Sequence, residues 1–201
     1  SSNPAPQISR HPASTHALKG QNVTLHCQVE IFQKNETNVR LTWRHDHHTI
    51  KADQILNHAK ATNEMVIYTS QLRLVRVGFH DDGFYQCHAS NKFGATSSKR
   101  AKLDIREFPV FSRKPKNVTV LAGDVVHLPC SATGHPKPTI SWRKDEGNTK
   151  FSAAEERRFD HHESQNMFLI TRSKAKDTGY YTCSAANDAG SINATVYVTV
   201  L

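Results

Sequence analysis

The chain repeats one seven-residue phrase about one domain-length apart, and each copy ends on a cysteine. Asp81–Cys87 and Asp177–Cys183 both read Asp-x-Gly-x-Tyr-x-Cys. A phrase this restricted, used twice at such a spacing, indicates an internal repeat in which each half folds on one plan. It limits the chain to architectures that are built twice from one unit, each with a cysteine at the end of the phrase.

Length and composition agree with two modest domains. The chain has 201 residues, of which 37% are hydrophobic, which suits two globular units of about 100 residues each. No apolar run approaches the roughly 20 residues that a membrane span needs. The opening residues do not form a basic-then-apolar leader, so we expect a mature fragment or a piece of a longer protein.

Further positions match when the two halves are laid on each other. An apolar pair at period two precedes each phrase, and an Ala-x-Asn-x-x-Gly turn follows it. The two tryptophans of the chain, Trp43 and Trp142, each follow the first cysteine of their half. The apolar pairs and turns are Leu72/Leu74 and Ala89–Gly94 in the first copy, and Phe168/Ile170 and Ala185–Gly190 in the second.

The four cysteines allow three disulfide connectivities, and their spacing alone does not choose among them. They are Cys27, Cys87, Cys130 and Cys183. No Cys-x-x-Cys pair or Cys/His run indicates a zinc site.

The local pattern predicts strands throughout, and hence an all-β fold. Residues 22–29 and 125–130 alternate apolar and polar side chains around a cysteine, as half-buried strands do. Residues 194–201 are rich in β-branched and aromatic side chains. Between such runs, Gly134–Thr139 carries two prolines and marks a turn.

Cys, then Trp, then Asp-x-Gly-x-Tyr-x-Cys resembles the immunoglobulin sandwich, here present twice. That resemblance implies bridges Cys27–Cys87 and Cys130–Cys183 across the sheets, with Trp43 and Trp142 packed against them. It also implies a tyrosine corner at Tyr85 and at Tyr181. We expect Asp81 and Asp177 to anchor the same corners, the latter through Arg157 or Arg158. One departure is Ser173, which stands where the first copy has Val77 and predicts a thinner second core at that end.

The intermediate set of immunoglobulin domains is favoured by Gly134–Trp142 and by the short span from tryptophan to second cysteine. We place the two domains at residues 1–106 and 107–201. The last predicted strand of the first domain ends at Ile105 and the pattern of the second domain starts at Pro109, so only Arg106–Phe108 connects them. Because it contains no Gly/Ser-rich linker, it predicts an extended, rather stiff tandem.

Several phrases beyond the general fold are similar to the leucine-rich repeats and immunoglobulin-like domains family, over nearly the whole chain. They match its first and second immunoglobulin domains in order. The most specific are Ala132–Trp142, Phe151–Arg158, Ala189–Ile192 and the junction Pro109–Pro115. The histidine content and the loop Ile31–Asn38 depart from vertebrate members, which predicts an invertebrate member.

The family resemblance implies a part of a single-pass cell-surface glycoprotein that modulates growth-factor and receptor tyrosine kinase signalling. The fragment then acts by binding a protein partner, a receptor or growth-factor component, without enzymatic activity or cofactor. A cell-adhesion tandem that pairs homophilically or binds heparan sulfate is the alternative. An intracellular muscle-type tandem is disfavoured by two complete cysteine pairs.

A histidine-rich segment, Arg44–Thr49, is a candidate metal site because His45 and His47 alternate on a strand around Asp46. A solvated hairpin turn is the favoured interpretation, and we assign no metal ligand. The 13 histidines matter collectively, because their protonation predicts stronger binding to acidic surfaces below about pH 6.5.

Basic residues cluster before the junction, where Arg100, Lys102 and Arg106 fall on one face of a predicted strand. The chain carries a formal charge of +8, so these three are candidate contacts for sulfated glycans or an acidic partner. An ordinary solvated face is the simpler interpretation. Nucleic acid is not expected, because no binding motif appears and aromatics do not interleave with the charges.

Four Asn-x-Thr sequons begin at Asn22, Asn35, Asn117 and Asn193. Together with paired cysteines they favour the secretory pathway. Asn35 lies in the longer loop of the first half and is expected to be the most accessible. Asn22 and Asn193 require outward-facing side chains.

No catalytic motif appears in the sequence. Gly-x-Ser-x-Gly, a phosphate-binding loop and His-Glu-x-x-His are all missing. An enzyme is therefore the weakest of the function classes.

Overall fold

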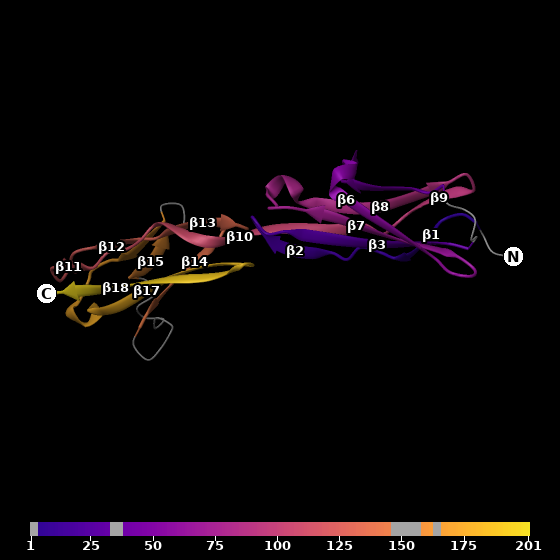
Figure 1. Cartoon of the computed structure of the whole chain (residues 1–201). Helices are drawn as coiled ribbons and strands as arrows, with labels where there is room; N and C mark the ends of the chain where they lie inside the picture. The colour runs from indigo at the N-terminus through magenta and orange to yellow at the C-terminus, as the bar shows by residue number, and fades with distance from the viewer. Residues whose placement is uncertain (1–3, 33–37, 146–157, 163–165) are drawn as a thin grey trace. The chain divides into compact units, whose positions relative to one another are not determined.

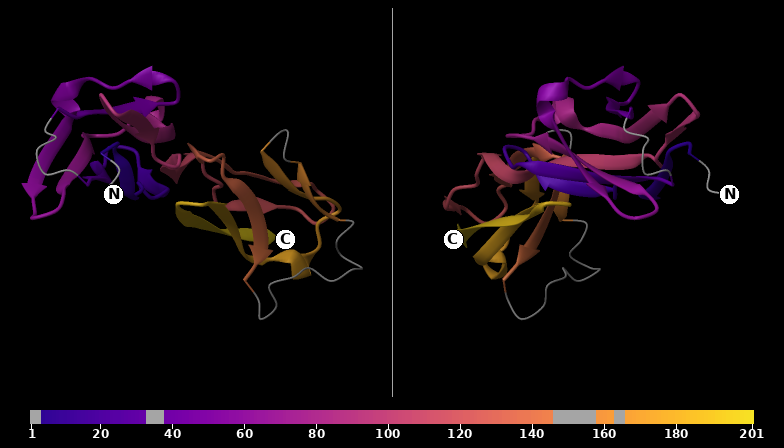
Figure 2. Two further views of the ribbon diagram at one scale, coloured as in Figure 1. Left: turned by 90° about the vertical axis from the view of Figure 1, so that its right-hand side faces the viewer. Right: turned by 45° about the vertical axis from the view of Figure 1, so that its right-hand side comes forward.

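The computed structural model describes residues 4–32, 38–145, 158–162 and 166–201. The chain divides into two compact units, Ser1–Ile105 and Arg106–Leu201, one residue from the expected boundary. Each unit folds as two facing layers of β-strands (Figures 1 and 2). No helix in the described ranges is long and apolar enough to cross a membrane.

The first layer of the first unit is built around strand β3, in which every second side chain is buried. β3 pairs antiparallel with β7 along its whole length, from Val23 opposite Leu74 to Ile31 opposite Val66. The strand order is β1 (Gln7–Arg10), β3 (Val23–Ile31), β7 (Val66–Leu74) and β6 (Ile55–Ala61).

The second layer of the first unit centres on β8, which begins at the repeated glycine. β8 pairs with β4 on one side and with the start of β10 on the other. The remaining strands extend this layer. Its members are β2 (Thr15–Leu18), β4 (Arg40–His45), β5 (His48–Thr49), β8 (Gly83–Asn91), β9 (Gly94–Ser97) and β10 (Ala101–Arg113).

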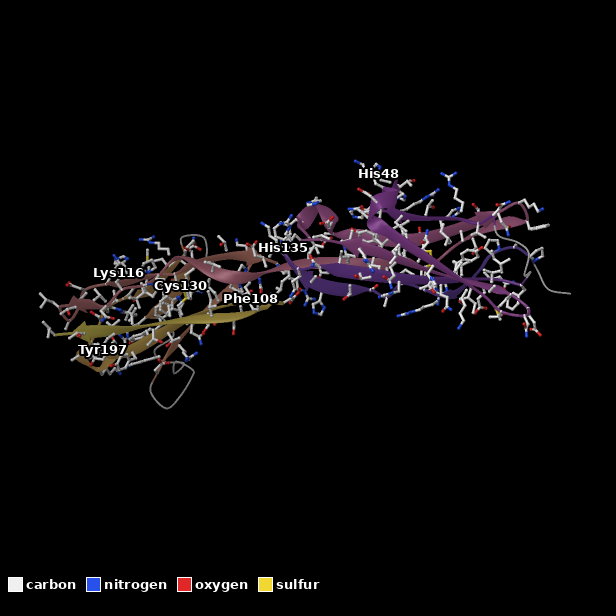
Figure 3. The ribbon with its side chains drawn as sticks, viewed as in Figure 1. His48, Phe108, Lys116, Cys130, His135 and Tyr197 are labelled. Atoms are coloured by element: carbon white, nitrogen blue, oxygen red, sulfur yellow. A yellow bond between two sulfur atoms is a disulfide. The ribbon has the colours of Figure 1, made fainter. Side chains whose placement is uncertain are left out.

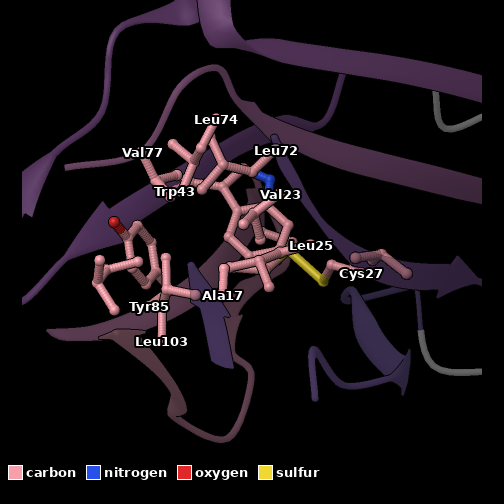
Figure 4. Close-up of a cluster of buried hydrophobic side chains, with 14 residues drawn as sticks. Ala17, Val23, Leu25, Cys27, Trp43, Leu72, Leu74, Val77, Tyr85 and Leu103 are labelled. Carbon is pink, nitrogen blue, oxygen red and sulfur yellow. A yellow bond between two sulfur atoms is a disulfide. The ribbon is translucent and has the colours of Figure 1, made fainter. Parts of the chain in front are cut away.

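The core of the first unit lies between these layers (Figure 4). Trp43 is fully buried, and its indole N–H donates to the Ser70 hydroxyl at 2.8 Å. The predicted pair Leu72 and Leu74 is buried beside it. Alternation at period two therefore identified the inward face correctly.

The second unit repeats the plan with two separate layers. One layer has β11 parallel to β18, followed by antiparallel β17 and β14; the other contains β12, β16 and β15. The strands are β11 (Val118–Val120), β12 (Val126–Pro129), β13 (Ser131–His135), β14 (Thr139–Lys144), β15 (Phe159–His162), β16 (Met167–Ile170), β17 (Gly179–Asn187) and β18 (Gly190–Val200).

Aromatic rings fill the core of the second unit. Phe168 stacks on Trp142 with ring centroids 5.0 Å apart, and Phe159 and Tyr181 pack around it. Ser173 is buried where the first unit has Val77. Its hydroxyl donates to the Leu121 carbonyl at 3.3 Å, so a hydrogen bond takes the place of an apolar contact at this end.

The junction differs from its expected form. Arg106–Phe108, expected as a connection between strands, lies inside the continuous strand β10. Ala101–Leu103 pair with β8, whereas Glu107–Arg113 pair with β13. Pairing with β13 keeps the chain extended, and this long-range partner is not visible in the local pattern.

Candidate functional site

The repeated phrase forms a closed corner in the first unit. The 3-10 turn η2 (Phe79–Asp81) leads into β8, and the Tyr85 hydroxyl donates back to the Asp81 carbonyl. Gly83 adopts a φ of 137°, where side-chain-bearing residues are strained. A Cβ there would also meet His45 Nε2 at 2.7 Å. Burial and the nearby carboxylates, Asp81 first, raise the pKa of Tyr85.

The second unit has the same corner with a stronger anchor. Tyr181 donates to the Asp177 carbonyl at 2.6 Å, after the turn η4 (Ala175–Asp177). Both terminal nitrogens of Arg158 donate hydrogen bonds to the Asp177 carboxylate, at 2.7 and 3.0 Å. Of the two arginines expected at this place, Arg158 makes the contact, and Arg157 lies outside the described residues.

The electrostatics of the second corner follow from its burial. Side-chain exposure is 7% for Arg158 and 2% for Asp177. Burial alone raises the pKa of Asp177, but hydrogen bonds from Arg158 and from the Lys174 N–H outweigh it, so the pKa is lowered. A fully paired, inaccessible carboxylate of this kind fixes structure and is out of reach of a ligand.

Among the described residues, no buried arginine pairs with the aspartate of the first corner. Asp81 accepts from the Gly78 N–H at 2.9 Å, and the ring of His80, which is 82% exposed, lies 3.3 Å away. The neighbouring Asp82 accepts from the Ile105 N–H and from Lys102. The same phrase is therefore secured by different partners in the two units.

A further residue covers each corner, which the sequence did not suggest. His45 stacks on Tyr85 with centroids 4.4 Å apart, and its Nε2 lies 2.7 Å from the Asp82 carbonyl. In the second unit, Lys144 Nζ lies 5.8 Å from the Tyr181 ring centre and donates to the Lys176 carbonyl. Each follows its tryptophan by two residues, a regularity in the sequence that could have indicated the pair.

The asparagine of each Ala-x-Asn-x-x-Gly turn ties a hairpin to the start of its unit. The Asn91 side-chain amide donates to the Pro4 carbonyl at 2.8 Å. Asn187 donates to the carbonyls of Glu107 and Pro136, both at 2.9 Å. The asparagine therefore holds each turn against a segment of its own unit that is distant in sequence.

The bridges join Cys27 to Cys87 and Cys130 to Cys183. Each second cysteine lies opposite a tryptophan in the strand ladder, Trp43 beside Cys87 and Trp142 beside Cys183. Each bridge therefore links the two layers next to the largest ring of its core, in the arrangement that the immunoglobulin resemblance implied.

The histidine-rich segment is a hairpin turn. β4 ends at His45, which pairs with His48 on β5, so His47 does not continue the strand as the metal interpretation required. Asp46 takes a φ of 56° and accepts from the Phe84 N–H, the first cause of its lowered pKa. Its neighbours His47 and His48 are exposed (Figure 3). No three His, Cys, Asp or Glu side chains gather to hold a metal anywhere in the described ranges.

The candidate polyanion contacts are only partly assembled. Arg100 and Lys102 lie over the Phe84 ring, with 4.0 and 5.1 Å to its centre. A hydrogen bond to Asp82 at 2.9 Å occupies the Lys102 ammonium and raises its pKa. Arg106 belongs to the second unit, where it donates to the Asp188 carbonyl at 3.5 Å. The local charge on this face is therefore weaker than the sequence suggested.

Three of the four sequons lie in the described residues, and their side chains are exposed. Each uses its Oδ1 as an acceptor: Asn22 from the Arg76 N–H, Asn117 from the Tyr197 N–H and Asn193 from the Ser184 hydroxyl. The side-chain nitrogen, which carries the sugar in N-glycosylation, is not used in these bonds. Asn35 falls outside the described residues.

The sheet face that bears Asn193 also carries two exposed tyrosines. Tyr180 and Tyr197 lie opposite each other on β17 and β18 and meet edge to face, with ring centroids 4.8 Å apart. They are 55% and 37% exposed. Aromatic rings of this kind are common at protein interfaces.

Comparisons with known proteins agree with this geometry. Residues 109–200 match the immunoglobulin I-set domain family, and residues 5–91 match the immunoglobulin domain family. The solved structure of Sidekick-1 immunoglobulin domains 1–4 superposes with a TM-score of 0.75, over 98% of this chain and 49% of that one. Its 22% identity shows likeness of fold alone.

Two curated relatives are more similar in sequence. Leucine-rich repeats and immunoglobulin-like domains protein 2 of Mus musculus is 40% identical over 98% of this chain and 19% of its own length. Protein 1 of the same name from Homo sapiens is 37% identical over 98% of this chain and 18% of its own length. The chain thus spans about a fifth of the length of the relatives it matches. It is a tandem of two immunoglobulin domains, and over nearly its whole length it is similar in sequence to proteins of the leucine-rich repeats and immunoglobulin-like domains family.

Proposed function

We propose that the chain is a non-enzymatic, extracellular protein-binding module of a single-pass cell-surface glycoprotein, which modulates growth-factor and receptor tyrosine kinase signalling. Its partner is then a receptor or a growth-factor component. We further propose that the chain comes from an invertebrate member of the family. The similarity to leucine-rich repeats and immunoglobulin-like domains proteins over 98% of the chain carries this proposal.

The structure supports a binding role for the exposed sheet faces. The aspartate and tyrosine that recur in the phrase are hydrogen-bonded within the two corners. Other rings and charges are exposed, such as Tyr180 on β17 and Arg100 just before β10. Binding through flat faces of this kind needs no cofactor and no catalytic group.

The test deletes the two domains from the full-length protein in cells. Ligand-stimulated phosphorylation of a co-expressed receptor tyrosine kinase is measured with and without the deletion, at matched surface levels. We expect the modulation to be lost, and cross-linking to recover the receptor with the intact tandem only. Unchanged modulation after deletion contradicts the proposal.

The second candidate is an adhesion tandem that pairs with itself or binds heparan sulfate. The charge of +8 favours it, because a basic surface attracts sulfated glycans. Sedimentation velocity and a heparin column separate the two candidates. A monomer that heparin does not retain leaves only the receptor-modulating role.

A further inference from the structure

A groove lies between β2 and β3 in the first unit. β1 pairs with only the far end of β3, at Gln28–Glu30. The chain then crosses to the other layer, where β2 pairs with β10. Among the described strands, none pairs with β3 over Val23–Cys27 on this side, and the space measures about 440 Å³.

The lining of this groove is basic and hydroxyl-rich. It includes Arg10, His11, His16 and His26, together with serine and threonine side chains, and it contains no Asp or Glu. Guanidinium and imidazolium groups bind sulfate oxygens. Because every ionisable side chain of the lining is neutral or positive, the groove suits an anionic ligand.

Two of the histidines are placed to make binding depend on pH. His11 Nδ1 accepts from the Lys99 N–H at 2.9 Å, so its neutral ring already presents Nε2–H as a donor. His16 is exposed and His26 half-buried on the outer side of β3. Protonation of an imidazole adds a positive charge, so a groove lined by histidines attracts an anion more strongly when those rings are charged.

The surroundings of the two histidines carry charges of both signs, because β10, which pairs with β2, bears Asp104 as well as Lys102. β7 places Gln71 opposite His26 and Arg73 two pairs further along, opposite Thr24. From β10, the Lys102 N–H donates to Ser14 in the groove wall, and its ammonium is paired with Asp82. The nearest acid on β3 is Glu30, four residues from His26 and opposite Gln7 on β1.

We propose that this groove is a sulfated-glycan site whose affinity rises on acidification through His16 and His26. It deepens the heparan-sulfate alternative above and assigns it to residues other than Arg100, Lys102 and Arg106. The receptor-modulating role does not depend on it. Hydroxyl groups along the walls, such as those of Ser14 and Thr24, are suited to the ring oxygens and hydroxyls of the sugar.

The test measures binding of a heparin-derived octasaccharide to the whole protein by calorimetry, at pH 7.5 and 5.5 and constant ionic strength. N-glycans are trimmed first, because Asn22 lies in the groove lining. We expect the wild type to bind about tenfold more tightly at pH 5.5, roughly what two added exposed ion pairs supply. The His16→Gln/His26→Gln variant should lose that gain, and Arg10→Gln should weaken binding at both pH values.

The matched control is His47→Gln/His48→Gln, which removes two exposed histidines from the hairpin turn, and it should keep the gain. A second control, Arg100→Gln/Lys102→Gln, should also keep it. If His16→Gln/His26→Gln retains the gain, or the hairpin variant loses it, the proposal is wrong. Absence of octasaccharide binding at either pH also overturns it, while leaving the receptor-modulating role standing.

Discussion

At the residue scale, the two corners use the same phrase but different anchors. In the second unit the ion pair of Arg158 and Asp177 is almost fully buried. The buried charge of each partner is therefore compensated by the charge of the other. In the first unit the equivalent Asp81 is 19% exposed and relies on a backbone N–H. Substitutions at the two corners should therefore have unequal effects.

Arg158→Met should lower the free energy of unfolding of the second unit by about 3–5 kcal/mol, because it leaves the Asp177 carboxylate buried without its cation. Urea denaturation followed by fluorescence measures this loss, since Trp142 reports on the second unit and Trp43 on the first. The control is His80→Met, which removes an exposed imidazole beside Asp81 and should cost well under about 1 kcal/mol. Equal losses in the two variants contradict the assigned anchors.

The lowered pKa of Asp177 predicts the direction of a pH effect. The unfolded chain has the ordinary aspartate value of about 3.9, so below about pH 5 the unfolded state binds more protons than the folded state. The free energy of unfolding should fall as the pH drops through 3.9 towards the folded value. Denaturation curves from pH 6 to 2.5 should show this slope reduced in Asp177→Asn, and an unchanged slope counts against the account.

At the element scale, the asparagine of each hairpin turn links that turn to a distant part of its own unit. Asn187 makes two hydrogen bonds to distant carbonyls, whereas Asn91 in the first unit makes one. Both also accept backbone N–H groups within the turn. The second fastening should therefore contribute more to stability than the first.

Asn187→Ala should lower the free energy of unfolding of the second unit by about 2–3 kcal/mol, and Asn91→Ala that of the first by about 1 kcal/mol, in proportion to the bonds lost. Equilibrium denaturation gives the totals. Hydrogen exchange at the amides of β17 and β18 shows whether the hairpin opens first in Asn187→Ala. A larger loss in Asn91→Ala contradicts the comparison.

The strands could be predicted from the sequence because the residue pattern that produces each strand lies within that strand. Alternation of apolar side chains marks β3 and β7, and β-branched residues mark β18. The immunoglobulin resemblance predicted the two tyrosine corners, because the residues of the repeated phrase themselves determine the turn. What the sequence did not supply are contacts between residues far apart, such as Asn91 with Pro4, because they depend on how completed strands pack.

The surface was harder to predict than the core. Lys102 looked like a free cation in the pattern of β10, but Asp82, twenty residues earlier, neutralises it. Conversely, the basic groove is lined by Arg10, His11, His16 and His26, which are scattered in sequence between β1 and β3 and come together only in the folded unit. Charge in a run is visible in a sequence, whereas charge gathered by folding is not.

At the scale of the whole molecule, each unit has its own core, its own bridge and its own corner. The cores share no side chain. A bridge closing a loop of this length contributes about 4 kcal/mol in the chain-entropy model, a large share of the stability of so small a domain. The display of binding faces therefore depends on both bridges forming within their own units.

The most direct measurement is a peptide map of the non-reduced protein by mass spectrometry. We expect two linked pairs, one joining the peptides of Cys27 and Cys87 and the other those of Cys130 and Cys183. Free thiols at these positions, or a bridge joining a cysteine of the first unit to one of the second, contradict the two-sandwich account.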